Sequence, residues 1–259
     1  MIDFHNHVIP GVDDGAADVA QSLAALETMR AQGAETVIAT PHVNGADTRD
    51  AETRERVLGE IDAGWEALKA AAPDAPRLER GAEVMLDVPA LDLADPRLRL
   101  AGTRFVLVEF PYMSVPPNGT QALFDLKMQG WTPVLAHPER YANLSPAMDE
   151  ADDWRRSGAL LQVNAASLLG RYGDVARKAA WGLVERGWAS YLCSDYHARG
   201  RYPVAEAVEA LKQAGASEQA ELLFRHNPAR LLAGEAPLPV PPVFRRTPLW
   251  RRVLGMGRG

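Results

Sequence analysis

The chain has 259 residues and a mass of 28.2 kDa, which is enough for one hydrophobic core and close to the upper limit for a single domain. Apolar residues make up 47% of the sequence and charged residues 24%, a balance that argues against a mainly disordered or fibrous protein. The 34 acidic residues outnumber the 28 basic ones, and this net charge of −6 argues against nucleic acid as the main partner.

The sequence contains one cysteine, Cys193, so no disulfide can form within the chain and no zinc site can be built from several thiolates. It has no run of 18 or more apolar residues, and its first seven residues lack the basic and apolar regions of a secretion signal. We therefore expect a cytoplasmic protein without a membrane-spanning segment.

Short apolar segments alternate with longer segments of helical periodicity. The predicted strands are residues 2–8, 36–42, 78–86, 105–110, 133–137, 160–164 and 190–195. The predicted helices are residues 18–32, 49–72, 121–129, 146–157, 174–186, 203–214 and 218–232, with an interruption of the last near Asn227 and Pro228. This alternation predicts an α/β fold with a mainly parallel sheet, and seven strands in about 195 residues favour a closed barrel over a doubly wound sheet.

The composition changes after Gly234, because residues 236–259 contain five prolines, five arginines and no acidic residue. We therefore expect one domain over residues 1–234 and a flexible Pro/Arg-rich tail over residues 235–259. Apolar residues interleave with the arginines at Phe244, Leu249, Trp250, Val253 and Leu254. Two hypotheses follow, a tail that rests on an anionic membrane surface and a tail that is only solvated.

Polar side chains that can bind metal recur at the ends of the predicted strands. They are His5, His7, His42, Glu83, Glu109, His137, Asp195 and His197, and Asn164 falls on the same rim without a clear role. Successive strand ends are one strand–helix unit apart, so a parallel barrel places all of these side chains on one rim. Converging carboxylates repel one another unless divalent cations neutralise them, and imidazoles with carboxylates suit Mn²⁺, Fe²⁺, Zn²⁺ or Mg²⁺. The sequence therefore predicts a centre with more than one metal ion.

Three further motifs each admit two interpretations. Asp13-Asp14-Gly15 is either a turn or the source of a carboxylate ligand. Arg140 is either a surface residue or a bidentate partner for phosphate oxygens, and its position three residues after His137 favours phosphate. Cys193 and Arg199 have the spacing of cysteine-dependent phosphatases, but the segment between them lacks glycine and contains an acid, which argues against a thiolate nucleophile.

These motifs resemble those of the polymerase-and-histidinol-phosphatase (PHP) superfamily. The matching segments are MIDFHNH at residues 1–7, GVDDG at 11–15, ATPH at 39–42, GAE at 81–83, EFPYM at 109–113, HPERY at 137–141 and SDYH at 194–197. They occur in the family's order from residue 1 to about residue 232. Within the superfamily, the sequence is most similar to the bacterial manganese-dependent tyrosine-protein phosphatases of capsule and exopolysaccharide operons.

The resemblance implies a distorted, TIM-like (β/α)₇ barrel whose centre holds two or three metal ions, Mn²⁺ before Mg²⁺, Fe²⁺ or Zn²⁺. It implies nine metal ligands, which are His5, His7, Asp14, His42, Glu83, Glu109, His137, Asp195 and His197. Arg140 matches the family's catalytic, phosphate-binding arginine. The implied substrate is the phosphotyrosine tail of a membrane tyrosine autokinase that controls polysaccharide export, which would bring the protein to the inner membrane.

One departure from the family pattern concerns the pocket around His197. Tyr196 and Ala198 flank this histidine where relatives carry a small residue and an asparagine, which leaves the shape of the pocket open.

Two other kinds of function stay open at this point. A histidinol-phosphate phosphatase or an exonuclease of the same superfamily would use the same ligands, although the acidic charge argues against a nuclease. A non-catalytic metal-binding regulator would use the barrel as a docking module, and Arg140 beside a complete ligand set argues against it.

Overall fold

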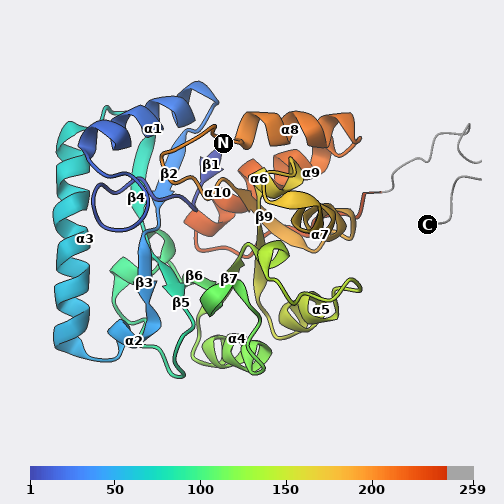
Figure 1. Ribbon diagram of the computed structural model, residues 1–259, viewed down its shortest axis with the longest axis horizontal. Helices are drawn as coiled ribbons and strands as arrows, with labels where there is room; N and C mark the ends of the chain where they lie inside the picture. Colours follow the sequence, from blue (N-terminus) through green and yellow to red (C-terminus); the bar gives the residue numbers. More distant parts are fainter. Residues whose placement is uncertain (244–259) are drawn as a thin grey trace, which may run out of the picture.

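The computed structural model describes residues 1–243, and Figure 1 shows its strands in the middle of the molecule with helices around them. The strands in this part of the chain are β1 (Ile2–Asp3), β2 (Thr36–Ala39), β3 (His42–Asn44), β4 (Arg77–Arg80), β5 (Glu83–Met85), β6 (Phe105–Glu109), β7 (Thr132–Ala136), β8 (Leu160–Asn164) and β9 (Ala189–Cys193). The helices are α1 (Val19–Ala31), α2 (Gly45–Thr48), α3 (Ala51–Ala71), α4 (Gly119–Met128), α5 (Asp149–Arg156), α6 (Ala165–Leu168), α7 (Gly173–Glu185), α8 (Val204–Gln213), α9 (Ser217–Glu221) and α10 (Asn227–Leu232).

Three of the predicted strands are not continuous, so the expectation of unbroken strands over residues 2–8, 36–42 and 78–86 was wrong. The strand predicted over residues 2–8 is shortened to Ile2–Asp3, and Asn6 makes an isolated bridge with Tyr196. The other two, over residues 36–42 and 78–86, are each broken in the middle. The first is interrupted between β2 and β3, where Pro41 has no N–H group to donate to a neighbouring strand. The second is interrupted between β4 and β5 at Gly81. Gly81 N still donates to Ala39 O and Glu83 N to Pro41 O, both at 2.9 Å, so the broken strands remain neighbours.

Neighbouring strands follow one another around the molecule, and the segments that follow the first and last strands are hydrogen-bonded to each other. The sheets have the orders β1-β2-β4 and β3-β5-β6-β7-β8-β9, and every strand pair is parallel. Beyond β1 and β9, Asp195 N donates to His5 O and His7 N donates to Tyr196 O, both at 2.8 Å. The predicted single-domain α/β fold with parallel strands is therefore confirmed, and these bonds join the first strand to the last in the manner of a barrel.

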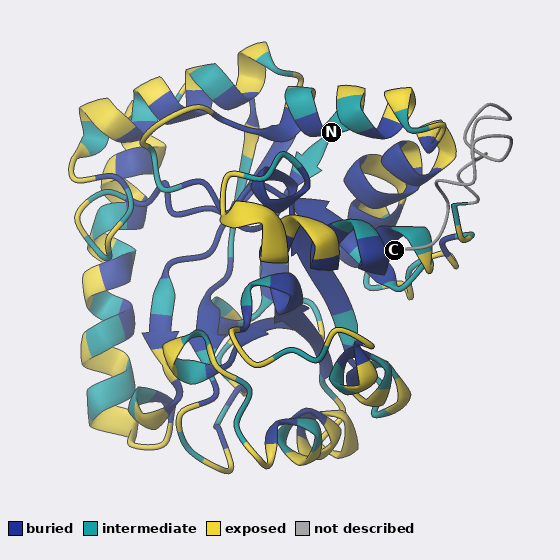
Figure 2. Ribbon diagram, turned by 45° about the vertical axis from the view of Figure 1, so that its right-hand side comes forward, coloured by how far each residue is buried: buried dark blue, intermediate teal, exposed yellow. Residues whose placement is uncertain are grey.

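Helix α3 shows how the sequence builds the outer layer. Leu58, Ile61, Trp65 and Leu68 recur at spacings of three and four residues, and all four are buried. The helix begins at a cap, because Asp50 accepts a hydrogen bond from Thr53 N at 2.8 Å. The outward faces of the helices are largely exposed, whereas the central strands are buried (Figure 2).

Alternation along β6 separates two apolar clusters. Val106 and Val108 belong to the cluster beneath the helices, whereas Phe105 and Leu107 belong to a smaller one between the strands. The smaller cluster contains Phe4, Ile38, Leu100, Phe105, Leu107, Val134, Ala136, Tyr191, Cys193 and Leu231, all fully or almost fully buried. The barrel interior is therefore packed with side chains at this level.

The C-terminal part of the described chain lies against the domain. The predicted interruption near Asn227 and Pro228 is confirmed, since a π-helical turn, Leu222–His226, separates α9 from α10. Beyond α10, Leu238 N donates to Asn227 Oδ1 at 2.8 Å, and Val243 N donates to Glu185 O at 2.9 Å. The boundary at residue 234 stays a prediction, and the apolar and basic residues of the predicted tail from Phe244 onward lie outside the described residues.

No helix within residues 1–243 combines the length and the apolar character needed to cross a bilayer.

Candidate metal centre

The structure brings all nine predicted ligands together at one end of the strands. His5 and His7 follow β1, Glu109 ends β6, His137 follows β7, and Asp195 and His197 follow β9. Four overlapping groups hold candidate ligand atoms within 4.8 Å of one another. The groups are His7, Asp14, His42 and His197; His5, His137 and Asp195; His5, His7 and Glu83; and His42, Glu83 and Glu109. Because the groups share members, the nine side chains form one continuous cluster.

His42 and Glu83 belong to the cluster, but their positions within the strands differ from the prediction. They were expected at the ends of strands, but they begin the short strands β3 and β5 and lie directly opposite each other in the ladder. The breaks at Pro41 and Gly81 precede them, so each starts a new strand segment at the level of the centre.

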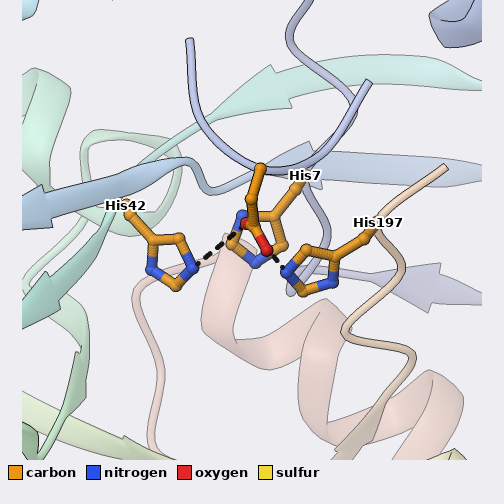
Figure 3. Close-up of side chains that lie close together, drawn as sticks. His7, His42 and His197 are labelled. Atoms are coloured by element: carbon orange, nitrogen blue, oxygen red, sulfur yellow. Dashed lines mark ion pairs between the residues drawn. The ribbon is translucent and has the colours of Figure 1, made fainter. Parts of the chain in front are cut away.

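The loop at residues 11–15 forms a turn and also brings one candidate ligand, Asp14, to the cluster. Asp13 accepts hydrogen bonds from Gly15 N at 2.9 Å and from His42 N at 3.2 Å, and its Oδ2 lies 2.7 Å from His7 Nδ1. Asp14 Oδ1 lies 3.2 Å from His197 Nε2 and 3.7 Å from His42 Nε2, and Figure 3 shows His7, His42 and His197 gathered around these ion pairs. Gly15 is required here, because a Cβ atom would collide with the carbonyl oxygen of His7.

Several buried polar atoms at the centre of the cluster have no hydrogen-bond partner within residues 1–243. They include His5 Nε2, His7 Nε2, His42 Nδ1 and Glu83 Oε2. The three nitrogens nevertheless lie only 3.1, 3.5 and 3.2 Å from Glu83 Oε2. Leaving one such group unsatisfied costs about 1–3 kcal/mol, so four around one point need an explanation. A divalent cation supplies it, because it can displace the Nε2 protons of His5 and His7 and be coordinated by these four atoms, so the residues present fit a metal centre.

The buried imidazoles and carboxylates of the cluster shift one another's pKa values. Burial lowers the pKa of His5, but Glu83 and Asp195 outweigh it and raise the pKa to about 9. Burial likewise lowers the pKa of His7, but hydrogen bonds with carboxylates raise it to about 10. Burial raises the pKa of Glu83, but His5 and His137 hold it well below its usual range. The imidazoles of His5 and His7 therefore carry a second proton at neutral pH, which an incoming cation must displace.

Two of the candidate ligands have a strained backbone. His137 has a φ of 35° and Asp195 a φ of 52°, both in the left-handed region that residues other than glycine rarely adopt. Such conformations cost of the order of 1–3 kcal/mol and concentrate at functional sites, which agrees with the place of both residues in the cluster.

Arg140 lies beside the cluster and faces a cleft. Its Nη1 donates to Asp195 Oδ2 at 2.7 Å, and its guanidinium carbon lies 4.1 Å from the centroid of the Tyr172 ring. Asp14, Tyr172 and His197 line the same cleft. The guanidinium is therefore placed where it can meet an anion that reaches the candidate ligands.

The cysteine-phosphatase interpretation is excluded by position. Cys193 is fully buried in the apolar cluster between the strands, and burial raises the pKa of its thiol well above the usual value. Arg199 does not cradle this thiol, since its guanidinium pairs with Asp14 at 3.2 Å.

Three residues near the centre were missed or left unassigned from the sequence. Gln162 contacts His5, Asn164 contacts Asp195, and Tyr172 lies against Arg140. Of these three, only the two amides could have been recognised from the sequence, because Gln162 and Asn164 are the polar residues of an otherwise apolar strand.

Comparison with known proteins identifies the family. A family model described as capsular polysaccharide synthesis, CpsB/CapC, matches residues 1–233. Tyrosine-protein phosphatase YwqE of Bacillus subtilis (strain 168) is 30% identical over 240 residues, which cover 88% of this chain and 92% of YwqE. Tyrosine-protein phosphatase CpsB of Streptococcus pneumoniae is 26% identical over 241 residues, which cover 90% of this chain and 98% of CpsB.

A solved structure supports the same family. It comes from work on B. subtilis YwqE and S. pneumoniae CpsB, described there as unique metal-dependent tyrosine phosphatases. It is 30% identical to this chain, covers 95% of it and all of its own length, and superposes with a TM-score of 0.72. The resemblance drawn from the motifs is thereby confirmed, and the chain belongs to the CpsB/CapC family of capsular polysaccharide synthesis.

Proposed function

We propose that this chain is a metal-dependent tyrosine-protein phosphatase that hydrolyses phosphotyrosine during capsule or exopolysaccharide synthesis. The observation that carries the proposal is the cluster of imidazoles and carboxylates with unsatisfied buried atoms, placed beside Arg140 at the edge of a cleft. Membership of a family whose relatives YwqE and CpsB are named tyrosine-protein phosphatases supports the substrate.

The proposed metal ligands are His5, His7, Asp14, His42, Glu83, Glu109, His137, Asp195 and His197, holding two or three ions. We propose Mn²⁺ as the cation, with Mg²⁺, Fe²⁺ and Zn²⁺ as alternatives that the same donor set admits. When bound, such ions supply Lewis acidity and an activated water for attack at phosphorus.

The chain's own residues perform the remaining tasks. Arg140 binds the non-bridging phosphate oxygens and stabilises the charge that develops on them. Asp13 holds His7 by its Nδ1, which leaves Nε2 directed at the centre. The phenolic leaving group has a pKa of about 10, so it needs less protonation than an alkoxide would.

We also propose that the phosphotyrosine belongs to the tail of a membrane tyrosine autokinase. The family's association with capsular polysaccharide synthesis and the tyrosine phosphatase names of the relatives support this partner. The protein would then act at the cytoplasmic face of the inner membrane, in reach of the kinase.

A substrate panel tests the reaction. Manganese-loaded protein is assayed on a phosphotyrosine peptide, histidinol phosphate and single-stranded DNA, and we expect the highest kcat/KM on the peptide. A higher value on either of the other two substrates would reassign the enzyme, and stoichiometric metal binding without turnover of any of them would make the protein a regulator.

Arg140→Ala tests the phosphate contact. We expect kcat/KM for the peptide to fall about 10²- to 10³-fold, the usual loss for one group that stabilises transition-state charge. The matched control is Arg177→Ala, because Arg177 is an exposed arginine on α7 whose guanidinium pairs with Asp174, three residues earlier in the same helix. Equal activity of the two variants would remove Arg140 from the mechanism.

A further inference from the structure

Two buried amides connect His5 with Asp195 behind the candidate metal centre. Gln162 and Asn164 lie on β8, and both are completely buried. Gln162 Oε1 lies 2.7 Å from His5 Nδ1, Gln162 Nε2 donates to Asn164 Oδ1 at 3.0 Å, and Asn164 Nδ2 donates to Asp195 Oδ2 at 2.7 Å. The two ends meet again on the other side, since His5 Nε2 lies 3.3 Å from Asp195 Oδ1.

These hydrogen bonds have only one consistent direction. The ionised Asp195 carboxylate can only accept, so Asn164 must turn its amide nitrogen toward Asp195. The carbonyl oxygen of Asn164 must then accept from the Gln162 amide nitrogen, which turns Gln162 Oε1 toward His5. Because Oε1 can only accept, His5 must carry a proton on Nδ1.

The same contacts divide the oxygens of Asp195 between two tasks. Oδ2 accepts from both Asn164 and Arg140, each at 2.7 Å. Oδ1 is left facing the imidazoles of His5 and His7, at 3.3 and 3.4 Å. Asn164 therefore orients the carboxylate so that one oxygen points at the centre.

We propose that Gln162 and Asn164 are positioning residues, which fix His5 in the tautomer that presents the Nε2 lone pair to the cations and fix the orientation of Asp195. The inference rests on the proposed metal ligands and not on the identity of the substrate. The Nδ1 atom of His7 contacts the carboxylate of Asp13 directly, whereas the Nδ1 atom of His5 is linked to the carboxylate of Asp195 through two amides. Groups that orient a metal-binding histidine through its second nitrogen strengthen metal binding, and this is the role that we assign to the two buried amides.

Zinc affinity of two Gln162 variants tests the proposal. The probe is Zn²⁺ alone, measured by competition with a chelating dye. Gln162→Met keeps the size of the side chain but offers His5 no acceptor, so we expect the affinity to fall about 10- to 100-fold. Gln162→Glu keeps an acceptor for His5, but it cannot donate to Asn164, so Asn164 must turn its amide nitrogen toward the glutamate and lose its bond to Asp195. Because the contact with His5 is kept, we expect this variant to bind zinc more tightly than Gln162→Met.

A role in packing alone predicts the opposite order. Methionine would then be tolerated, and the buried charge of glutamate would be the costlier change. Gln219→Met serves as the matched control, because Gln219 is a buried glutamine that donates to Pro241 O on another part of the chain. Unchanged affinity in Gln162→Met, or weaker binding by Gln162→Glu than by Gln162→Met, would overturn the proposal.

A spectroscopic measurement tests the tautomer without any variant. In the ¹H–¹⁵N spectrum of the zinc-loaded wild-type protein, we expect His5 to be protonated at Nδ1 and bound to metal through Nε2. Protonation of His5 at Nε2 would contradict the proposal even if Gln162→Met failed to fold. His5→Ala separates the two levels of the argument, because weak zinc binding by His5→Ala together with normal binding by Gln162→Met would leave the metal ligands in place and remove only the role of Gln162.

Discussion

The side chains enclosed by the strands form two layers, and one layer contributes to stability whereas the other forms the candidate metal centre. Along β6, Phe105 and Leu107 are followed at the same spacing by Glu109. Along β9, Tyr191 and Cys193 are followed in the same way by Asp195. All six side chains are buried, yet the first two of each series lie in an apolar cluster and the third belongs to the candidate metal centre. One layer stabilises the fold by removing apolar surface from water, whereas the other holds charges that burial disfavours. Changes in the two layers should therefore affect different properties.

The largest expected effect is on activity, from the combined change His5→Ala and His7→Ala. These residues supply ligand atoms to three of the four candidate metal groups, so we expect phosphatase activity to fall more than about 1,000-fold, the equivalent of about 4 kcal/mol. The measurement is kcat/KM on a phosphotyrosine peptide, with circular dichroism to show that the variant is folded. Full activity in a folded double variant would reject the site.

Leu107→Ala probes the apolar layer and should change stability instead. Leu107 is fully buried between the strands, so we expect the free energy of unfolding to fall by about 2–5 kcal/mol. Denaturant titration measures this loss, and metal content per folded chain should stay that of the wild type. Loss of metal from the folded Leu107→Ala variant would show that the two layers are coupled.

The pH dependence of metal binding sharpens the comparison. His5 and His7, with pKa values of about 9 and about 10, hold protons at neutral pH that a cation must displace. Metal affinity should therefore rise with pH, by about tenfold per unit for each displaced proton, and binding should release protons into weakly buffered solution. Affinity that stays constant from pH 6.5 to 8.5 would contradict these protonation states.

The same pKa values predict the stability of the metal-free protein. Because both values are raised above the unfolded value of about 6.5, their contribution is fully present below that pH and is lost as the pH rises through 9 to 10. The difference in Tm between metal-loaded and metal-free protein should accordingly widen as the pH increases.

The smallest effect is expected from Cys193→Ala. The thiol packs in the apolar cluster, so its removal should cost only about 1 kcal/mol of stability and leave kcat/KM unchanged. A thiol alkylator should likewise leave the activity of the folded wild-type protein intact. Loss of activity in this variant, at wild-type metal content, would return the cysteine to the mechanism.

The order of strands and helices was predictable because each apolar segment is short and each helical segment carries a regular buried stripe, as in α3. The gathering of distant histidines and acids was predictable for a related reason. Parallel strands end on the same side, so His5, Glu109 and Asp195 meet although they are far apart in the sequence.

The interruptions and the backbone strain were not predictable in the same way. Pro41 removes a hydrogen-bond donor, but whether a strand then ends or resumes at His42 depends on its neighbours. The left-handed conformations of His137 and Asp195 run against local preference and persist only because the surrounding structure imposes them. Gln162 and Asn164 were visible as polar residues in an apolar strand, but their partners lie in the segments that follow the first and last strands.

The most direct test of the central claim is the position of bound metal. Crystals of the manganese-loaded protein, with diffraction measured at the manganese absorption edge, should give two or three anomalous peaks among His5, His7, Asp14, His42, Glu83, Glu109, His137, Asp195 and His197. Peaks elsewhere on the chain, or no peak among these side chains in crystals of active enzyme, would contradict the account.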